Sequence, residues 1–197
     1  MRRQDFIPLI VRIFKFTSYL EIGCGNDLVF SEINIHKVGV DPNSGGTLRM
    51  TSDEFFSQNT EKFDLIFIDG LHEANQVLKD IQNSVNCLND GGLILVHDCS
   101  PVSEENQFVP HNNKPDVRWN GDVWKAFVLT RKRSDLDCAV GNFEHGLGCI
   151  KVRPNSSKLE INESEVSQLQ WKPFETNRSE YLRLMAYEDF LRWIEFE

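Results

Sequence analysis

The stretch Tyr19-Leu-Glu-Ile-Gly-Cys-Gly-Asn26 decides how the rest of this chain is interpreted. It is a short apolar run with an acid at Glu21, followed by a turn with glycines at positions 23 and 25. Glycine adopts positive φ at little cost and lets the backbone come close to a ligand. Open α/β sheets bind nucleotides at such a turn, at the carboxyl end of a first parallel strand. The stretch therefore predicts a nucleotide-type site.

A second acid lies at the interval that such a site requires. Residues 37–41 form a predicted strand that ends in Asp41, sixteen residues after Gly25. A carboxylate in this place accepts hydrogen bonds from two ribose hydroxyls. A dinucleotide fold is disfavoured because its third glycine is replaced by Leu28. The acid at Glu21 would face a pyrophosphate, whereas it suits a cofactor with a cationic amino-acid end. A structural turn without a ligand is the simpler alternative.

Two further strands deliver polar side chains to the same edge. Residues 63–68 and 93–96 are near-continuous apolar runs, as expected of buried parallel strands. A helix over residues 74–88, with apolar residues at helical spacing, connects them. The strands end in Asp69-Gly-Leu-His72 and in His97-Asp98. Acids and histidines are therefore expected to converge at the carboxyl ends of adjacent strands.

The remaining segments are assigned from pattern and composition. Residues 99–117 lack periodicity and contain three prolines, and they are predicted to form a lid at the ligand-bearing edge. Residues 136–141 and 147–152 are predicted to form a closing antiparallel hairpin. Shorter elements are expected as helices near 4–15, 28–32, 54–56 and 119–133 and as a strand at 47–50.

The composition becomes polar after Pro154, so we expect one domain over residues 1–153 to be followed by a separate segment, 154–197. That segment reads as an exposed linker followed by an amphipathic helix. Asn177 is its predicted N-cap, with Glu180 as the reciprocal acid. The helix is expected to dock on the domain or to build a dimer contact.

The combined motifs resemble class I S-adenosylmethionine-dependent methyltransferases. Glu21-x-Gly-x-Gly, Asp41 and the Asp-Gly-Leu-His and His-Asp strand ends are similar to the small members associated with sugar and polysaccharide modification, as is Gly121-Asp-Val-Trp-Lys125. The resemblance covers residues 18–152. It implies an α/β, Rossmann-like, doubly wound sheet of seven mostly parallel strands in three layers, with an antiparallel seventh strand between strands five and six.

The resemblance also implies which residues contact S-adenosylmethionine. In this family the junction after the third strand, here predicted at 47–50, usually contacts the adenine. Met50 would therefore flank the adenine ring, and Ser52 or Asp53 would accept a hydrogen bond from its amine. Ser52 and Asp53 are also candidate helix caps. The full predicted cofactor set is Glu21, Gly23, Cys24, Gly25, Asp41, Met50, Ser52, Asp53 and Asp69.

Two chemistries fit the strand ends. The cofactor carries an activated methyl group, so the protein must align an acceptor and remove a proton if the acceptor is a hydroxyl. His97 suits a general base, with His72 as an alternative and Asp98 beside it. Alternatively, Asp69, His97 and Asp98 would hold a divalent ion such as Mg, Mn or Zn. In the simplest view Asp98 only caps a turn and His97 packs beneath the loop.

Composition limits the partners. The 197 residues are 40% hydrophobic and 26% charged, as in ordinary globular chains. A net charge of -9 disfavours nonspecific binding to nucleic acid or to anionic membranes. The apolar residues near the N-terminus are interrupted by Arg12 and suggest neither a signal peptide nor a membrane span. Five cysteines without a Cys-x-x-Cys pair suggest reduced thiols in a cytoplasmic protein.

We therefore expect a cytoplasmic O-methyltransferase for a small polar acceptor such as a sugar. A homodimer is an open alternative to a monomer. The rival interpretation is a noncatalytic cofactor-binding or assembly subunit with the same fold.

Overall fold

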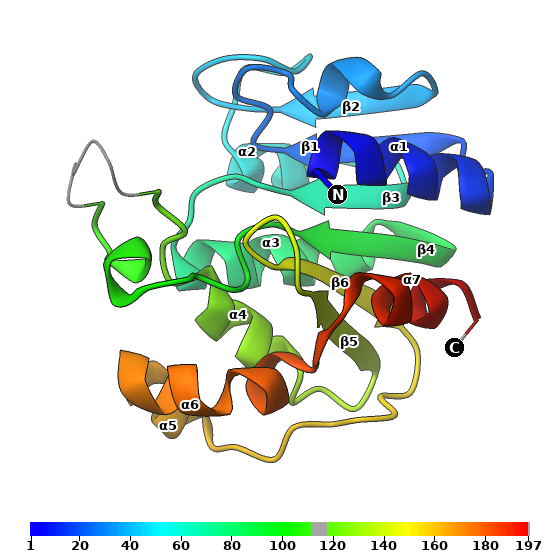
Figure 1. The fold of residues 1–197 in the computed structure, drawn as a ribbon. Coiled ribbons are helices and arrows are strands. Elements are labelled where there is room, and N and C mark those ends of the chain that lie inside the picture. The colour runs from blue at the N-terminus through cyan, green and yellow to red at the C-terminus, as the bar shows by residue number, and fades with distance from the viewer. Residues whose placement is uncertain (112–117, 197) are drawn as a thin grey trace.

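The computed structural model describes residues 1–111 and 118–196, and this part of the chain is built on one mixed β-sheet (Figure 1). The seven strands of the described residues follow the order β2-β1-β3-β4-β6-β5-β7. Neighbouring strands are parallel except at β6, which is antiparallel to both β4 and β5. The strands are β1 (Ser18–Ile22), β2 (His36–Val40), β3 (Phe63–Ile68), β4 (Leu88–Val96), β5 (Leu136–Gly141), β6 (Leu147–Val152) and β7 (Leu184–Met185). The predicted Rossmann-like sheet with an antiparallel strand at 147–152 is confirmed.

Helices cover both faces of the sheet and complete three layers (Figure 1). One face carries α1 (Arg3–Phe14), the short 3-10 helix η1 (Phe30–Glu32) and α7 (Tyr187–Phe196). The other face carries α2 (Ser52–Gln58), α3 (Ala74–Asn86), α4 (Val123–Thr130), α5 (Glu163–Gln168) and α6 (Trp171–Leu182). Within the described ranges, every helix is too short or too polar to cross a bilayer.

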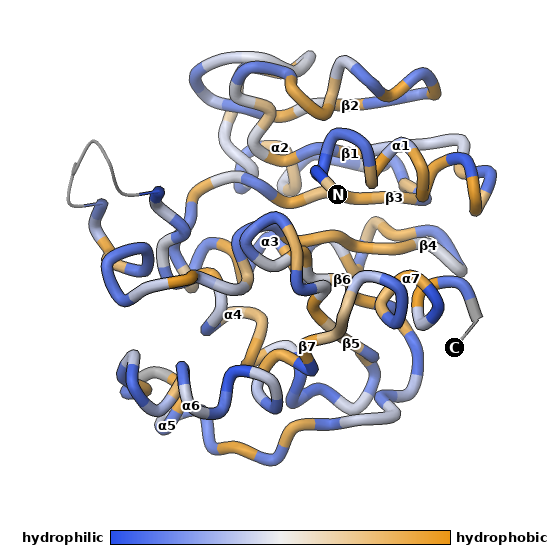
Figure 2. The backbone as a smooth tube through the Cα atoms, in the orientation of Figure 1, coloured by the Kyte–Doolittle hydropathy of each residue, from blue (hydrophilic) through white to orange (hydrophobic). Residues whose placement is uncertain are grey.

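The central strands are hydrophobic along their length because both of their faces are buried, and they stand out in Figure 2. In β3, Leu65 and Phe67 enter the core beneath α1 and α7, whereas Ile66 and Ile68 enter the core beneath α3 and α4. Burying one such side chain contributes about 1.5–3 kcal/mol. This double burial explains why the sequence of β3 does not alternate between apolar and polar residues.

Residues 47–50 do not form the predicted third strand. Only Leu48 makes an isolated bridge, to Val40 of β2. The preceding Gly46 has φ +66°, and a Cβ there would lie 2.6 Å from the carbonyl oxygen of Gly39. The segment is thus turned too tightly against β2 to run beside it. The sheet still has seven strands because β7, which was not predicted, pairs with β5 at the opposite edge.

The fourth strand, β4, starts at Leu88, earlier than the predicted 93–96. Leu88 pairs with Phe63, and the register shifts before Leu93. The glycines at 91 and 92, which suggested a turn, lie inside this irregular strand. A Cβ on Gly92 would lie 2.6 Å from the carbonyl oxygen of Asp64, so the glycine permits a close strand approach.

The end of the chain also differs from its prediction. Asn177 is not an N-cap but lies inside α6, where its Nδ2 donates to the carbonyl of Pro173 at 3.0 Å. The helix ends at Arg183, which has φ +47° and turns the chain into β7. The apolar residues that were assigned to one terminal helix are therefore divided between α6, β7 and α7.

A buried carboxylate ties the C-terminal segment to the sheet. Asp137 of β5 is fully buried and accepts a hydrogen bond from Arg153 Nε at 2.9 Å and one from Arg183 Nη1 at 2.8 Å. Two guanidinium partners compensate the desolvation of the buried charge. Residues beyond 154 thus share electrostatic contacts and both apolar cores with the preceding chain.

The loop after β4 contains the 3-10 helix η2 (Glu104–Gln107). Buried Asn106 holds it, because its Oδ1 accepts from the Ser103 N–H at 2.8 Å and its Nδ2 donates to the carbonyl of Arg118 at 2.6 Å. The other part of the predicted lid, residues 112–117, lies outside the described residues.

We expect Phe174→Ala to lower the free energy of unfolding by about 3–5 kcal/mol, the usual cost of truncating a buried phenylalanine. Phe174 of α6 is fully buried and stacks on Trp124 of α4, with ring centroids 4.0 Å apart. Val152→Ala, at a half-exposed position, should change it by less than about 0.5 kcal/mol. Urea unfolding measures both; equal effects would mean that α6 is not part of the core.

Candidate active site

The turn after β1 brings three strand ends together. Gly23 has φ +87°, and a Cβ there would lie 2.2 Å from the carbonyl oxygen of Asp69. Its N–H donates to Val40 at the end of β2 at 2.8 Å, while the Asp69 N–H donates to Ile22 at 2.8 Å. Only glycine fits this position, because both its conformation and its space exclude a side chain.

Asp41 follows β2 and is held by backbone amides. Its Oδ2 accepts from the Gly25 N–H at 2.9 Å, and its Oδ1 accepts from Asn43 and Ser44 at 2.8 and 2.9 Å. Burial opposes ionisation of Asp41, but hydrogen bonds from these amides outweigh it and keep its pKa below the ordinary value. The carboxylate is therefore charged and fixed beside the glycine turn, as the spacing predicted.

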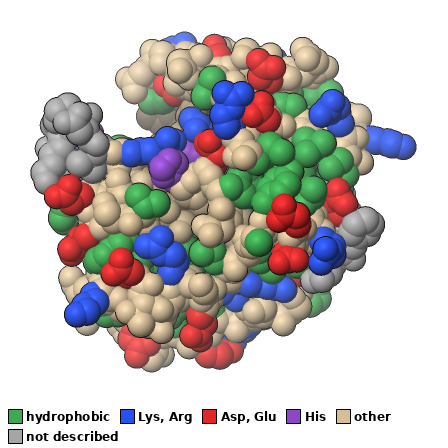
Figure 3. All heavy atoms as spheres, in the orientation of Figure 1, with side chains coloured by type: hydrophobic (Ala, Val, Ile, Leu, Met, Phe, Trp, Pro, Cys, Tyr) green, Lys and Arg blue, Asp and Glu red, His purple; other side chains and the backbone are tan. Residues whose placement is uncertain are grey.

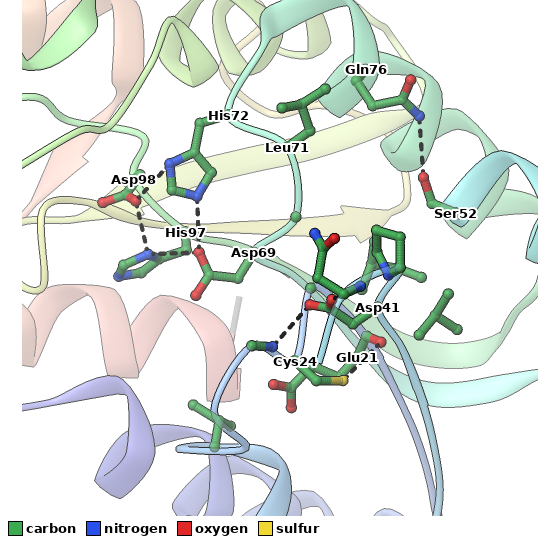
Figure 4. A pocket seen from close by; sticks show the side chains of 18 of the residues that line it. Glu21, Cys24, Asp41, Ser52, Asp69, Leu71, His72, Gln76, His97 and Asp98 are labelled. Atoms are coloured by element: carbon green, nitrogen blue, oxygen red, sulfur yellow. Dashed lines mark hydrogen bonds and ion pairs between the residues drawn. The ribbon is translucent and has the colours of Figure 1, made fainter. Parts of the chain in front are cut away.

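A cavity of about 700 Å³ opens along the carboxyl ends of β1 to β4. Figure 4 shows Glu21 and Asp41 on one side of it and the group around Asp69 on the other. From outside, histidine, acidic and basic side chains meet beside a hollow in the surface (Figure 3). The predicted site residues that line the cavity are Glu21, Gly23, Cys24, Gly25, Asp41, Ser52, Asp53, Asp69, His72, His97 and Asp98.

Met50 is the predicted residue that does not line this cavity. Its Sδ lies 3.4 Å from the Nε2 of Gln58, and its side chain packs against the core on the α3 side of the sheet. The irregular segment at 47–50 turns Met50 away from the edge where a true strand would have placed it.

The start of α2 forms one wall of the cavity. The helix is capped by Thr51, whose hydroxyl accepts from the Glu54 N–H at 3.2 Å, and not by Ser52 or Asp53 as predicted. Gln76 of α3 donates from Nε2 to Ser52 Oγ at 3.2 Å and to Asp53 Oδ1 at 3.0 Å. Sequence reasoning missed Gln76, because only the packing of α3 on α2 brings it to the cavity.

Glu21 is buried beneath the glycine turn. Its Oε2 accepts from the Tyr19 hydroxyl at 2.5 Å, a contact between side chains on the same side of β1. Burial raises the pKa of Glu21 to about 8, against the lowering effect of the Tyr19 hydrogen bond. Cys24 is buried too, and burial raises the pKa of its thiol, so the side chain is an inert thiol in this wall.

The ends of β3 and β4 bring together two acids and two imidazoles (Figure 4). His97 Nδ1 lies 3.0 Å from Asp69 Oδ1 and 3.2 Å from Asp98 Oδ2. His72 Nε2 lies 3.3 Å from Asp69 Oδ1, and His72 Nδ1 lies 3.4 Å from Asp98 Oδ2. The predicted convergence of these four residues is observed, although the roles assigned to them remain predictions.

The two histidines have different surroundings. Burial would lower the pKa of His97, but the charge of Asp69 and the carboxylates of Asp98 and Glu144 outweigh it and hold the pKa well above its usual value. His97 is only 3% exposed, and a protonated imidazole in this setting cannot accept another proton. The ring of His72 is partly exposed to the cavity, and contacts with Asp69 and Asp98 raise its pKa against the effect of burial.

Asp98 owes its position to its backbone and to one amide. Its φ is +58°, a left-handed conformation that aspartate adopts more readily than most residues. Fully buried Asn120 donates to Asp98 Oδ1 at 2.6 Å. The next residue, Gly121, has φ +60°, and a Cβ on it would lie 1.7 Å from the carbonyl oxygen of His72. The Gly121 motif therefore closes the segment against the turn after β3.

Three further residues at this end were missed by sequence reasoning. Trp119 lines the cavity and lies beside His72, with ring centroids 5.2 Å apart. Arg3 of α1 lines it as well, and Glu144 of the β5–β6 loop reaches His97. The distance of Arg3 and Glu144 from the motifs along the chain leaves no local signal, whereas Trp119 directly precedes the Asn-Gly-Asp-Val-Trp segment.

The described residues contain one group arranged like metal ligands, and it differs from the predicted trio. Ligand atoms of Asp69, His72 and Asp98 lie within 4.8 Å of one another. His72 thus takes the place that the sequence interpretation gave to His97. The reason is geometric: His97 lies behind the two carboxylates, whereas His72 reaches them from the cavity.

Comparisons with known proteins agree with this fold. The sequence profile of a family described as a methyltransferase domain matches residues 33–99. The search of curated proteins found no match to the sequence.

Among solved structures, the cofactor-bound Rv0187 protein from MTB shares 14% identity over 78% of this chain and 80% of its own, with a TM-score of 0.60. An O-methyltransferase from Bacillus cereus in complex with SAH shares 16% identity over 77% and 80%, with a TM-score of 0.53. TomG of Streptomyces achromogenes, an O-methyltransferase of tomaymycin synthesis in complex with SAM, shares 13% over 77% and 79%, with a TM-score of 0.56.

The sheet order and the structural neighbours define a methyltransferase Rossmann-like fold. The match to the methyltransferase-domain family covers residues 33–99, about a third of the chain.

The raised pKa of Glu21 predicts a pH-dependent stability. The acid is more easily deprotonated when unfolded, so its contribution is fully present below pH 4.5 and is lost as the pH rises towards about 8. The difference in unfolding free energy between Glu21→Gln and the wild type should therefore move in favour of the variant between pH 5 and 9, by about 1.4 kcal/mol for each unit of pKa shift. Urea unfolding at several pH values measures it. A difference that stays constant with pH would contradict the assignment.

Proposed function

We propose that this protein transfers the methyl group of S-adenosylmethionine to a hydroxyl of a small polar acceptor, with a sugar as the candidate class. One observation carries the proposal: a single cavity contains both the glycine turn with Asp41 and the group around His72. Two of the structural neighbours described above are named O-methyltransferases. The sugar acceptor is supported by the sequence resemblance alone.

The residues around the cavity divide into three proposed cofactor contacts. Glu21 and the glycine turn would bind the amino-acid end, where the cationic ammonium group would favour the ionised form of the buried Glu21 carboxyl. Asp41 would accept from the ribose hydroxyls through Oδ2, which accepts one amide N–H and retains a lone pair, whereas Oδ1 already accepts two. Ser52, Asp53 and Gln76 would contact the adenine. When bound, the cofactor supplies a methyl group that its sulfonium has already activated.

We assign the proton-accepting role to His72 and not to His97, which sequence reasoning preferred. Both histidines line the cavity and face carboxylates through both ring nitrogens, but the side chain of His72 is 19% exposed whereas that of His97 is only 2% exposed. A hydroxyl placed near His72 would give its proton to the imidazole once the imidazole is neutral. Asp69 and Asp98 orient the His72 ring and stabilise its charged form.

A divalent ion is a second candidate, because two carboxylates and an imidazole converge at the cavity. This donor set suits Mg, Mn or Zn. Asp69, His72 and Asp98 would hold the ion, which would lower the pKa of an acceptor hydroxyl as a Lewis acid.

We expect S-adenosylhomocysteine to raise the melting temperature and Asp41→Ala to weaken its binding by about 1.5–3 kcal/mol, roughly 10- to 150-fold in Kd, since a charged acceptor is lost. Asp64→Ala is the matched control. Its carboxylate also accepts backbone N–H groups, from Thr17 and Ser18, but it lies at the opposite end of β3. Calorimetry with both variants separates loss of a ligand contact from loss of stability. Stabilisation by NADH and not by S-adenosylhomocysteine would refute the cofactor.

We expect His72→Gln to reduce turnover by about 10²–10⁴-fold, the usual contribution of a general base, with little change in cofactor affinity. His36→Gln is the control, because its ring is exposed and paired with Glu61 at the far end of β2. Release of S-adenosylhomocysteine in the presence of sugars with free hydroxyls measures turnover.

The same assay separates the alternatives. A chelator should leave the wild-type rate unchanged if His72 acts alone, whereas loss of activity and recovery with Mg or Mn would establish the metal site. Binding of S-adenosylhomocysteine without turnover on any acceptor would favour a noncatalytic subunit.

A further inference from the structure

Four charged side chains close a ring behind the catalytic edge of the sheet. Arg3 Nη1 lies 3.0 Å from Glu144 Oε2, and Arg3 Nε lies 3.5 Å from Asp69 Oδ2. His97 Nδ1 lies 3.0 Å from Asp69 Oδ1, and His97 Nε2 lies 3.7 Å from Glu144 Oε2. We call Arg3, Asp69, His97 and Glu144 the charge ring. Cationic and anionic groups alternate around it.

The charge ring joins parts of the chain that are far apart in sequence. Arg3 opens α1, Asp69 and His97 follow β3 and β4, and Glu144 lies in the loop between β5 and β6. Their side chains are 2–18% exposed, so solvent screens the contacts weakly. Pairing with His97 and Arg3 lowers the pKa of Glu144 to about 2, which keeps it charged. Buried charges of this kind persist only when each has partners.

The backbone that carries Glu144 is held in an unfavourable conformation. Glu144 and His145 have φ of +48° and +61°, and Gly146 follows at +88°. Left-handed backbone is unfavourable for a residue that carries a side chain. The loop is fixed by the N–H groups of Cys99 and Ser100, which donate to Gly146 at 2.9 Å and to His145 at 2.7 Å. Strain that the surroundings enforce in this way is typical of functional sites.

We propose that Glu144 and Arg3 are positioning residues for methyl transfer, which act on His72 through His97 and Asp69. This inference rests on the proposed function. Glu144 forms an ion pair with Nε2 of His97 at 3.7 Å, and this leaves Nδ1, on the other side of the ring, directed at Asp69. Arg3 holds the second oxygen of Asp69, so its first oxygen is directed to His97 and His72 together.

The geometry leaves His72 dependent on contacts that it does not make itself. Asp69 Oδ1 is shared by both imidazoles, and Asp98 Oδ2 lies 3.2 Å from His97 and 3.4 Å from His72. If His97 rotated, it would release both carboxylates and free the His72 ring to turn. Among the described residues, the hydrogen-bond and ion-pair partners of His72 are Asp69, Asp98 and Trp119, and Glu144 is not one of them. Any effect of Glu144 on His72 must therefore pass through the charge ring.

The test combines charge removal with a readout at His72. Glu144→Gln keeps the shape but removes the charge, and Arg3→Met removes the guanidinium. Glu144→Gly also removes the carboxylate and relieves the left-handed backbone, so it serves if the first variant folds poorly. Arg192→Met and Glu160→Gln are controls, because these exposed residues pair with Asp189 and Lys158 and not with the charge ring in the described part of the chain.

Histidine-labelled full-length protein, saturated with S-adenosylhomocysteine, should give shifted ¹⁵N ring signals for both His97 and His72 in Glu144→Gln and Arg3→Met. The affinity of Glu144→Gln for S-adenosylhomocysteine should stay within about twofold, while its turnover falls roughly tenfold or more. The turnover of the double variant Arg3→Met/Glu144→Gln should be no lower than that of the less active single variant, because the two residues act as one unit. The controls should match the wild type.

The proposal is overturned if the His72 signals in Glu144→Gln match those of Glu160→Gln. It is also overturned if Glu144→Gln loses cofactor affinity in proportion to turnover, which indicates general loosening. Should the wild type release no S-adenosylhomocysteine with any acceptor, the proposed function fails, but the imidazole signals still decide whether the charge ring positions His72.

Discussion

The close approach at Gly23 is the constraint on which the site depends. The carbonyl of Asp69 occupies the space where a side chain of residue 23 would lie, and this contact brings the ends of β1 and β3 together. Val40 receives the N–H of the same glycine, so the end of β2 is drawn in as well. Asp41 and Asp69 each follow one of these strands. A single glycine thus brings Asp41 and Asp69 to the same cavity.

Charge pairing explains why so many ionisable groups tolerate burial at this edge. Isolated charges in the interior cost several kcal/mol each, and the protein avoids that cost in two ways. Asp69 and Glu144 remain ionised because imidazole and guanidinium groups lie beside them and lower the pKa of each carboxyl. Glu21 has a phenol as its hydrogen-bond partner, and burial makes it a weak acid instead. Neighbouring acids on one cavity therefore differ in how readily they ionise.

The accuracy of prediction depended on the range of the interactions involved. Asp41 was found because a strand, a turn and a spacing specify it, and the structure places it beside Gly25. The strand expected at 47–50 does not form because Gly45 and Gly46 turn the chain just before it, and Met50 does not line the cavity. The glycines at 91 and 92 have the composition of a turn, yet they serve a bulge between paired strands. Local sequence cannot distinguish a turn from a close strand contact, because glycine permits both.

The sequence by itself determined the strands other than β7, the antiparallel hairpin, the glycine turn and the acids and histidines at the strand ends. These follow from apolar runs and short spacings, since neighbouring parallel strands must end at a common edge. Only the tertiary structure decided that His72 is partly exposed to the cavity while His97 is almost fully buried in its wall. It also placed Arg3 and Glu144, 141 residues apart in the chain, in the same ring of charges. Such contacts arise where α1 and the β5–β6 loop pack over one strand edge, and no periodicity within either segment encodes them.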